Sequence, residues 1–211
     1  MKSLVPAVAL ALATGAAFAA PVVTTQNTAN STVAGVCIYG FDGANPCSNV
    51  TYTPASGANY RTDSVPGIAA RPVGSTGTYL TTGPSDGTPV TISISNPTTA
   101  QYNYFGFLAG SIDTYNQIAF TLTNGSTTTL SGSQLAGLAG VTPDGNQGEA
   151  RYFNVTLGAG EFYSSIQLSS SANAFETDNH AFGRNTVPVP GGLALIGAGL
   201  AAAAAVRRRR A

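Results

Sequence analysis

The stretch Gln117-Ile118-Ala119-Phe120-Thr121-Leu122-Thr123 decides the fold, because large apolar residues alternate in it with small or polar ones. The same period of two recurs at residues 90–95, 152–157 and 166–168. Alternation of this kind places apolar side chains on one face of a strand and polar ones on the other. Several such stretches with Asn-Gly, Asp-Gly and proline breaks between them predict antiparallel strands that are each buried on one side. We therefore expect an all-β domain, an antiparallel β-sandwich of jelly-roll type, with no helix of any length.

Two segments ahead of these strands have a different composition. Residues 33–53 are expected to form two strands around a loop that contains Cys37 and Cys47. Residues 54–89 are rich in proline, glycine, serine and threonine, with one strand candidate at Tyr79-Leu80. We expect this second segment to be a long surface excursion of a single domain.

The two cysteines, Cys37 and Cys47, stand ten positions apart. In an exported chain a lone close pair indicates a disulfide, and closing so short a loop stabilises a protein by about 2–3 kcal/mol in the chain-entropy model. A metal site would need further ligands nearby, and the only histidine, His180, is far away in the sequence. We expect the disulfide.

The N-terminus has the three parts of a secretory signal peptide. Lys2 gives the positive charge, Leu4 to Phe18 form the apolar run, and small residues stand before Ala20. This pattern predicts export through the Sec translocon and cleavage by signal peptidase between Ala19 and Ala20. A permanent N-terminal anchor is disfavoured because the apolar run is short.

The C-terminus, residues 187–211, combines a Pro188-Val189-Pro190 motif, an uncharged run over 191–206 and the cluster Arg207, Arg208, Arg209 and Arg210. As a helix, the uncharged run would reach about 24 Å, less than the roughly 30 Å of a hydrocarbon core. The arginines would stay on the cytoplasmic side. We expect a transient inner-membrane anchor, with residues 20–186 as the exported domain.

Charge excludes one class of partner. Removing both ends would leave four arginines against nine carboxylates, a net charge of −5. A mildly acidic domain has no basic footprint for nucleic acid.

The tail resembles the PEP-CTERM sorting signal of Gram-negative, often biofilm-forming bacteria, with Val189 where that family usually has glutamate. The segment 104–116 resembles the YFG-x-x-x-GSID-x-YN stretch of a subgroup of these surface proteins, and 175–181 resembles its FE-x-DN-x-A ending. The resemblance implies processing by a membrane protease, exosortase, and delivery to the cell surface or to an extracellular polysaccharide matrix. It implies location and architecture rather than a reaction.

Carboxylates offer the best candidates for a ligand site. Glu176 and Asp178 are two positions apart, so in a strand they share a face. Asp144, Asn146 and Glu149 lie in one loop. Calcium could bind the oxygens at either place, although such residues also form ordinary turns. We expect His180 to be a surface histidine near a strand end.

Aromatic residues leave a second function open. Five of the nine tyrosines are candidates for stacking on sugars: Tyr102, Tyr104, Tyr115, Tyr152 and Tyr163. The first interpretation is a structural surface or matrix protein without enzyme activity. The alternative is a carbohydrate-binding module, with or without calcium. A glycoside hydrolase with paired acids is disfavoured, because the chain has no tryptophan to form a sugar platform.

Overall fold

The computed structural model describes residues 20–95 and 101–184. The predicted signal peptide and the predicted sorting tail, with the Pro188-Val189-Pro190 motif and Arg207 to Arg210, lie outside the described residues. In the part of the chain that is described, no helix is both long and apolar enough to cross a membrane.

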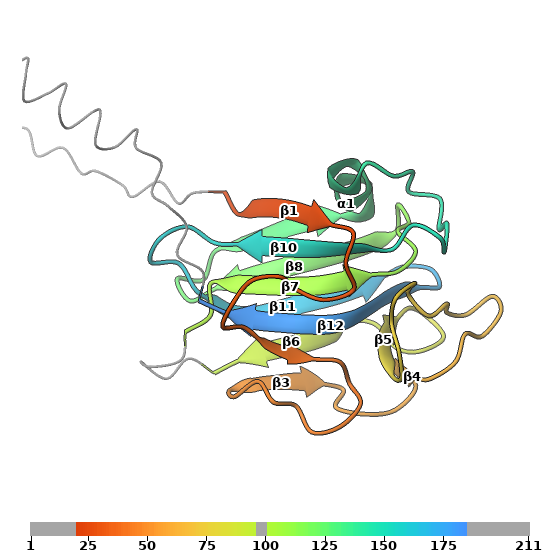
Figure 1. Cartoon of the computed structure of the whole chain (residues 1–211), viewed down its shortest axis with the longest axis horizontal. Helices are drawn as coiled ribbons and strands as arrows, with labels where there is room; N and C mark the ends of the chain where they lie inside the picture. Colours follow the sequence, from red (N-terminus) through yellow and green to blue (C-terminus); the bar gives the residue numbers. More distant parts are fainter. Residues whose placement is uncertain (1–19, 96–100, 185–211) are drawn as a thin grey trace, which may run out of the picture.

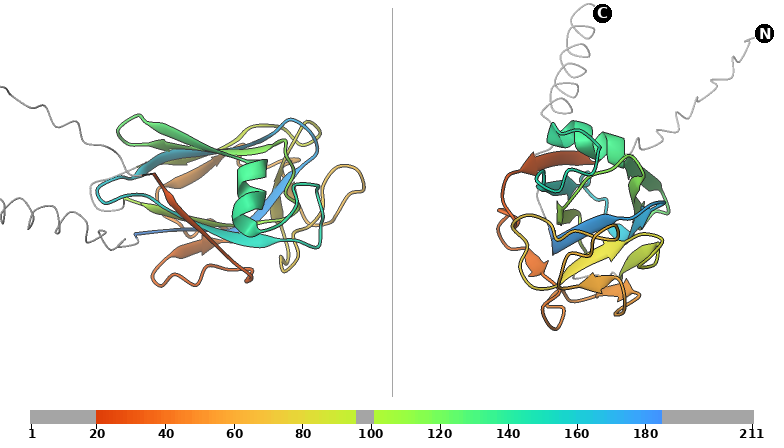
Figure 2. Two further views of the ribbon diagram at one scale, coloured as in Figure 1. Left: turned by 90° about the horizontal axis from the view of Figure 1, so that it is seen from above. Right: turned by 90° about the vertical axis from the view of Figure 1, so that its right-hand side faces the viewer.

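The strands form two antiparallel sheets that lie one on the other (Figures 1 and 2). Sheet A has the order β1 (Val22–Gln26), β10 (Arg151–Thr156), β7 (Tyr104–Ala109), β12 (Phe175–Gly183), β5 (Tyr79–Thr82), β4 (Tyr60–Arg61), and β2 (Cys37–Tyr39) also pairs with β12. Sheet B has the order β3 (Val50–Thr53), β6 (Val90–Ile94), β11 (Tyr163–Ser170), β8 (Asn116–Leu122), β9 (Thr127–Ser131). The predicted all-β sandwich is confirmed.

The main core lies between the two sheets, and in sheet B it follows the period of two in the sequence. Ile92, Ile166 and Phe120 stand in register on β6, β11 and β8, and all three are fully buried. Sheet A contributes a layer of five buried phenylalanines: Phe105, Phe107, Phe153, Phe175 and Phe182. Each fully buried side chain of this size stabilises the fold by about 1.5–3 kcal/mol, so the alternating positions dominate the stability of the sandwich.

The central strands of sheet A are buried on both faces, which corrects the expectation of one buried face per strand. Every residue of β7 is buried. The connection from β1 to β2 packs Ala29, Val33 and Val36 against the outer face, over a cluster that includes Tyr104 and Tyr152. Because long connections rather than a third sheet form this cover, strand periodicity alone did not reveal it.

The connection from β4 to β5, residues 62–78, covers another part of that outer face, near β5 and the start of β12. It lies within the segment that we expected to be a surface excursion, yet Ala69 and Ala70 are buried and Ala69 packs against Tyr79. The segment also contains two strands, β4 and β5, instead of one. The expectation of a purely exposed excursion was therefore wrong.

A short helix, α1 (Gly132–Ala139), was missed by the sequence analysis. Ser131 and Gln134 form a reciprocal capping box at its start, and Gly140 ends it with a φ of 68°. Both are recognised helix-end signals, but eight residues are too few to show a helical period. The helix contacts β1 and β9 at one side of the sandwich (Figure 2).

The disulfide between Cys37 and Cys47 is present, with 5.4 Å between the two Cα atoms. Cys37 begins β2 in sheet A, whereas Cys47 precedes β3 in sheet B. The two strands expected in residues 33–53 thus exist, but they belong to different sheets. The disulfide fastens one sheet to the other at this edge.

Candidate functional site

The acidic pair on β12 lies on one face of the strand, as predicted, but beneath the β4–β5 connection. Glu176 and Asp178 are 2% and 1% exposed. Charged groups this deeply buried need protein partners, because desolvation of an unpaired carboxylate is costly. The contacts of each carboxylate therefore indicate what it does.

Glu176 joins three segments through its two carboxylate oxygens. Oε1 accepts a hydrogen bond from the backbone N–H of Ala70 at 2.9 Å, and Oε2 accepts one from the hydroxyl of Ser111 at 2.8 Å. Burial raises the pKa of Glu176, and these two hydrogen bonds oppose the rise. Because both carboxylate oxygens accept hydrogen bonds from other segments of the chain, Glu176 holds these segments together.

Asp178 holds the later part of the β4–β5 connection against β12. Its Oδ2 accepts a hydrogen bond from the Ser75 hydroxyl at 2.5 Å, and its Oδ1 accepts one from the N–H of Asn179 at 2.6 Å. Burial raises the pKa of Asp178 to about 6, against the lowering effect of these donors. Asn179 in turn donates to the carbonyl of Ala29 at 2.9 Å, which ties down the β1–β2 connection.

The segments 104–116 and 175–181 meet in the structure, because β7 pairs with β12. Beyond the Ser111 contact, Asn116 accepts a hydrogen bond from the N–H of Asp113 at 2.6 Å and donates to the carbonyl of Ala174 at 3.1 Å. Tyr115 donates to the carbonyl of Asn173 at 3.0 Å. The polar residues of the two motifs thus hold the β7–β8 turn against the start of β12.

Packing explains why position 106, in the segment 104–116, is a glycine. A Cβ atom at this position would lie 2.5 Å from the Tyr104 hydroxyl oxygen and 2.6 Å from that of Tyr152. Glycine therefore makes room for two fully buried tyrosines on the outer face of sheet A.

A cleft of about 470 Å³ opens beside Glu176. Asp113 and Asp144 line it together with Tyr115 and part of the β4–β5 connection. Burial raises the pKa of Asp113, and the nearby charge of Asp144 adds to the rise. Burial raises the pKa of Tyr115 to about 12, and hydrogen bonding to the Asp113 carboxylate and its charge add to the rise.

The three residues of the predicted calcium loop do not face one common site. Asp144 lines the cleft, but its Oδ1 accepts a hydrogen bond from the N–H of Asn146 at 3.1 Å. Asn146 accepts one from the N–H of Gly148 at 3.0 Å, and neither it nor Glu149 lines the cleft. Among the described residues, no three acidic, histidine or cysteine side chains are grouped so as to hold a metal ion. Calcium binding stays a prediction.

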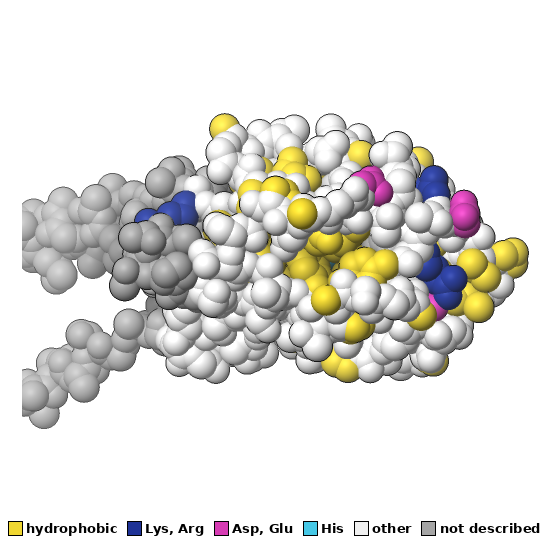
Figure 3. Space-filling model, turned by 90° about the horizontal axis from the view of Figure 1, so that it is seen from below, with side chains coloured by type: hydrophobic (Ala, Val, Ile, Leu, Met, Phe, Trp, Pro, Cys, Tyr) yellow, Lys and Arg dark blue, Asp and Glu magenta, His cyan; other side chains and the backbone are white. Residues whose placement is uncertain are grey.

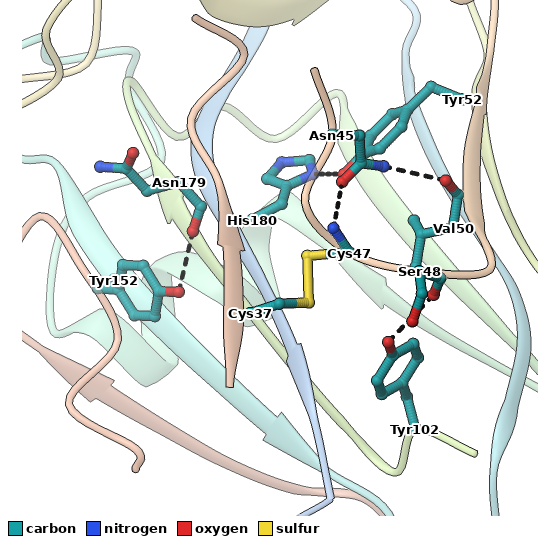
Figure 4. Close-up of a disulfide and its surroundings, with 10 residues drawn as sticks. All are labelled: Cys37, Asn45, Cys47, Ser48, Val50, Tyr52, Tyr102, Tyr152, Asn179 and His180. Carbon is teal, nitrogen blue, oxygen red and sulfur yellow. Dashed lines mark hydrogen bonds between the residues drawn. A yellow bond between two sulfur atoms is a disulfide. The ribbon is translucent and has the colours of Figure 1, made fainter. Parts of the chain in front are cut away.

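His180 is fully buried, so its expected place at the surface was wrong. Its Nδ1 lies 3.0 Å from the hydroxyl of Tyr52 (Figure 4). Its Nε2 lies 2.9 Å from the hydroxyl of Thr177. The Phe41 and Phe105 rings meet it edge-on. Desolvation lowers the pKa of His180 to about 3, so the ring is neutral at physiological pH.

A β-bulge explains the error. The register of β12 against β7 shifts between Asp178 and Ala181, and Asn179 has a left-handed φ of 49°. An inserted residue reverses the alternation of side chains beyond it. His180 and Phe182 therefore point into the sandwich, whereas an unbroken strand would turn His180 outward.

The tyrosines on which the sugar-binding alternative was based are mostly inaccessible. Tyr104, Tyr152 and Tyr163 have no exposed surface, so these three cannot stack on a sugar.

Seen from the side of β3 and β4, hydrophobic side chains gather in the middle of the surface and charged ones mainly at the end away from the terminal segments (Figure 3).

Comparisons with protein-family models, with curated proteins and with solved structures found no match.

We expect the Cys37→Ser/Cys47→Ser double variant to lose about 2–3 kcal/mol of the free energy of unfolding, because the ten-residue loop gains freedom in the unfolded chain. Urea unfolding of the oxidised wild type and of the variant measures the loss. A reductant should lower the stability of the wild type and leave that of the variant unchanged. Alkylation of both cysteines in native, unreduced protein would contradict the prediction.

Proposed function

We propose that this chain is an exported structural protein of a Gram-negative envelope, delivered to the cell surface or extracellular matrix through a C-terminal sorting signal. The observation that carries the proposal is the order of three features in the tail. A proline motif at 188–190 precedes an uncharged run over 191–206, which precedes four arginines. An exosortase-type protease is the partner that this order implies, with the inner membrane as a transient anchor.

The physical chemistry of the tail suits a temporary anchor. Pro188 and Pro190 lack backbone donors and block a continuing helix, so they favour an extended stretch that a protease can bind. The uncharged run is short for a membrane span, and the arginines resist translocation. Together these properties would hold the extended stretch at the outer face of the membrane.

The described domain supports an extracytoplasmic and non-catalytic role. A structural disulfide is typical of oxidising compartments outside the cytoplasm. Three residues with side chains suited to catalysis, Glu176, Asp178 and His180, are buried and hydrogen-bonded to other parts of the domain. These contacts fasten loops to sheet A and fill the core, which is what a durable matrix domain needs.

Export is tested at the N-terminus. We expect material recovered from the envelope to begin at Ala20, because small residues at positions 17 and 19 fit the signal peptidase. Intact-mass and N-terminal peptide analysis give the result. Ala19→Arg should leave the precursor uncut, whereas Phe18→Leu, between the two small residues, should be cut normally. Exported protein that keeps Met1 would refute this part of the proposal.

A further inference from the structure

The outer face of sheet B differs from every other face of the two sheets. Sheet A is covered by two long connections, but no outward side chain of sheet B is buried. Seven of these thirteen positions are exposed and six are half-buried. The register aligns them in three rows across the strands: Thr51, Ser93, Ser165, Thr121, Thr127; Thr53, Thr91, Gln167, Ala119, Thr129; and Ser169, Gln117, Ser131.

The chemistry of this face is uniform. Twelve of the thirteen side chains carry a hydroxyl or a primary amide, and Ala119 is the exception. None of the five strands of sheet B contains an Asp, Glu, Lys or Arg. Neighbouring strands are about 4.8 Å apart, and residues on one face repeat about every 6.7 Å along a strand. The face is therefore a regular, uncharged array of groups that both donate and accept hydrogen bonds.

This chemistry excludes several partners. An anionic polymer or an anionic membrane surface requires clustered cations, and the face has none. A protein interface has an apolar core enriched in aromatic residues and depleted in serine. A neutral polysaccharide presents rows of uncharged hydroxyls that donate and accept hydrogen bonds. The polar side chains of this face can match both roles.

We propose that the outer face of sheet B binds a neutral, hydroxyl-rich polysaccharide. The inference rests on the proposed function, because it names the matrix component that an exported domain would meet. Water competes for every hydroxyl, so each contact contributes little and one domain binds weakly. Many domains along one polymer would bind strongly through avidity.

Affinity electrophoresis of the full chain as recovered from the envelope tests the proposal, with dextran or galactomannan as the neutral polymer and alginate as the charged one. The central variant is Ser93→Glu/Gln167→Glu. The matched control is Ser56→Glu/Gln147→Glu, which makes the same changes at exposed positions off the face. Both add the same charge, so only the position differs.

We expect a neutral polymer to retard the wild type and alginate not to. The central variant should bind the neutral polymer about tenfold more weakly than the wild type, because it places two carboxylates on the proposed binding face. The control should bind within about twofold of the wild type. Equal urea midpoints for the two variants show that folding is intact.

Three results would overturn the proposal: no retardation in either neutral gel, equal retardation in alginate, or an equal loss in both variants. Concentration-dependent dimerisation that only the central variant abolishes would also overturn it and would assign the face to a second copy of the chain. Failure of the proposed function is separate, because an unprocessed tail would leave retardation intact.

Discussion

Acidification from pH 6.5 towards pH 4 is expected to destabilise the domain through His180. The pKa of this residue is about 3 in the folded protein and 6.5 when unperturbed. Below pH 6.5 the unfolded chain therefore binds a proton that the folded chain refuses. Above pH 6.5 the ring is neutral in both states, so His180 does not lower the free energy of unfolding. Below pH 6.5 it lowers this free energy by about 1.4 kcal/mol per pH unit. Over two pH units the loss approaches about 3 kcal/mol.

Buried carboxyl groups act in the opposite direction. The pKa of Asp178 is raised from 3.8 to about 6, and burial also raises those of Glu176 and Asp113. Their contribution to stability is present at low pH and is lost as the pH rises through the folded pKa. Wild-type stability should therefore vary less between pH 4 and 6 than His180 alone would dictate.

Two variants separate these effects. His180→Gln keeps a neutral polar group and removes the proton uptake, so its stability should gain on that of the wild type as the pH falls. Asp178→Asn removes one opposing carboxyl, so it should lose stability more steeply than the wild type. Urea unfolding between pH 4 and pH 7 gives both slopes. If wild type and His180→Gln ran parallel, or if native His180 titrated near pH 6.5 by NMR, the burial argument would be wrong.

The second large effect is expected in the tail. Replacing Pro188 and Pro190 by alanine should trap the full-length form, because a continuous helix would withdraw the extended stretch from a protease. Deleting Arg207 to Arg210 should misdirect the chain, because the stop against translocation is lost. Immunoblots of membrane, surface and medium fractions measure both outcomes.

The control for this prediction is the middle residue of the motif. Val189→Glu restores the acid usual in the resembling signal and should leave processing unimpaired. Normal processing of the proline variant, or trapping of Val189→Glu, would contradict the role given to the motif.

The sandwich was predictable because sheet B obeys the period of two at residues such as Ile92, Phe120 and Ile166. The double burial of sheet A was not, since its cover consists of connections whose Ala29, Val33 and Ala70 carry no periodic signal. The helix at 132–139 is indicated in the sequence only by its end signals, Ser131 with Gln134 and Gly140, because eight residues show no helical period.

The site was predictable to a similar degree. The shared face of Glu176 and Asp178 follows from strand geometry and is confirmed. Their burial depends on Ala70 and Ser75, about a hundred positions earlier, so no local pattern indicates it. His180 was misplaced because a bulge at Asn179 reverses the alternation, and one asparagine in a polar run does not reveal a bulge.

The central claim is that the tail is a sorting signal removed on delivery. Intact-mass spectrometry of surface-extracted protein, from a strain that expresses an exosortase, tests it most directly. We predict a chain that begins at Ala20 and lacks Arg207 to Arg210. A surface-extracted chain that still ends in Ala211 would contradict the account.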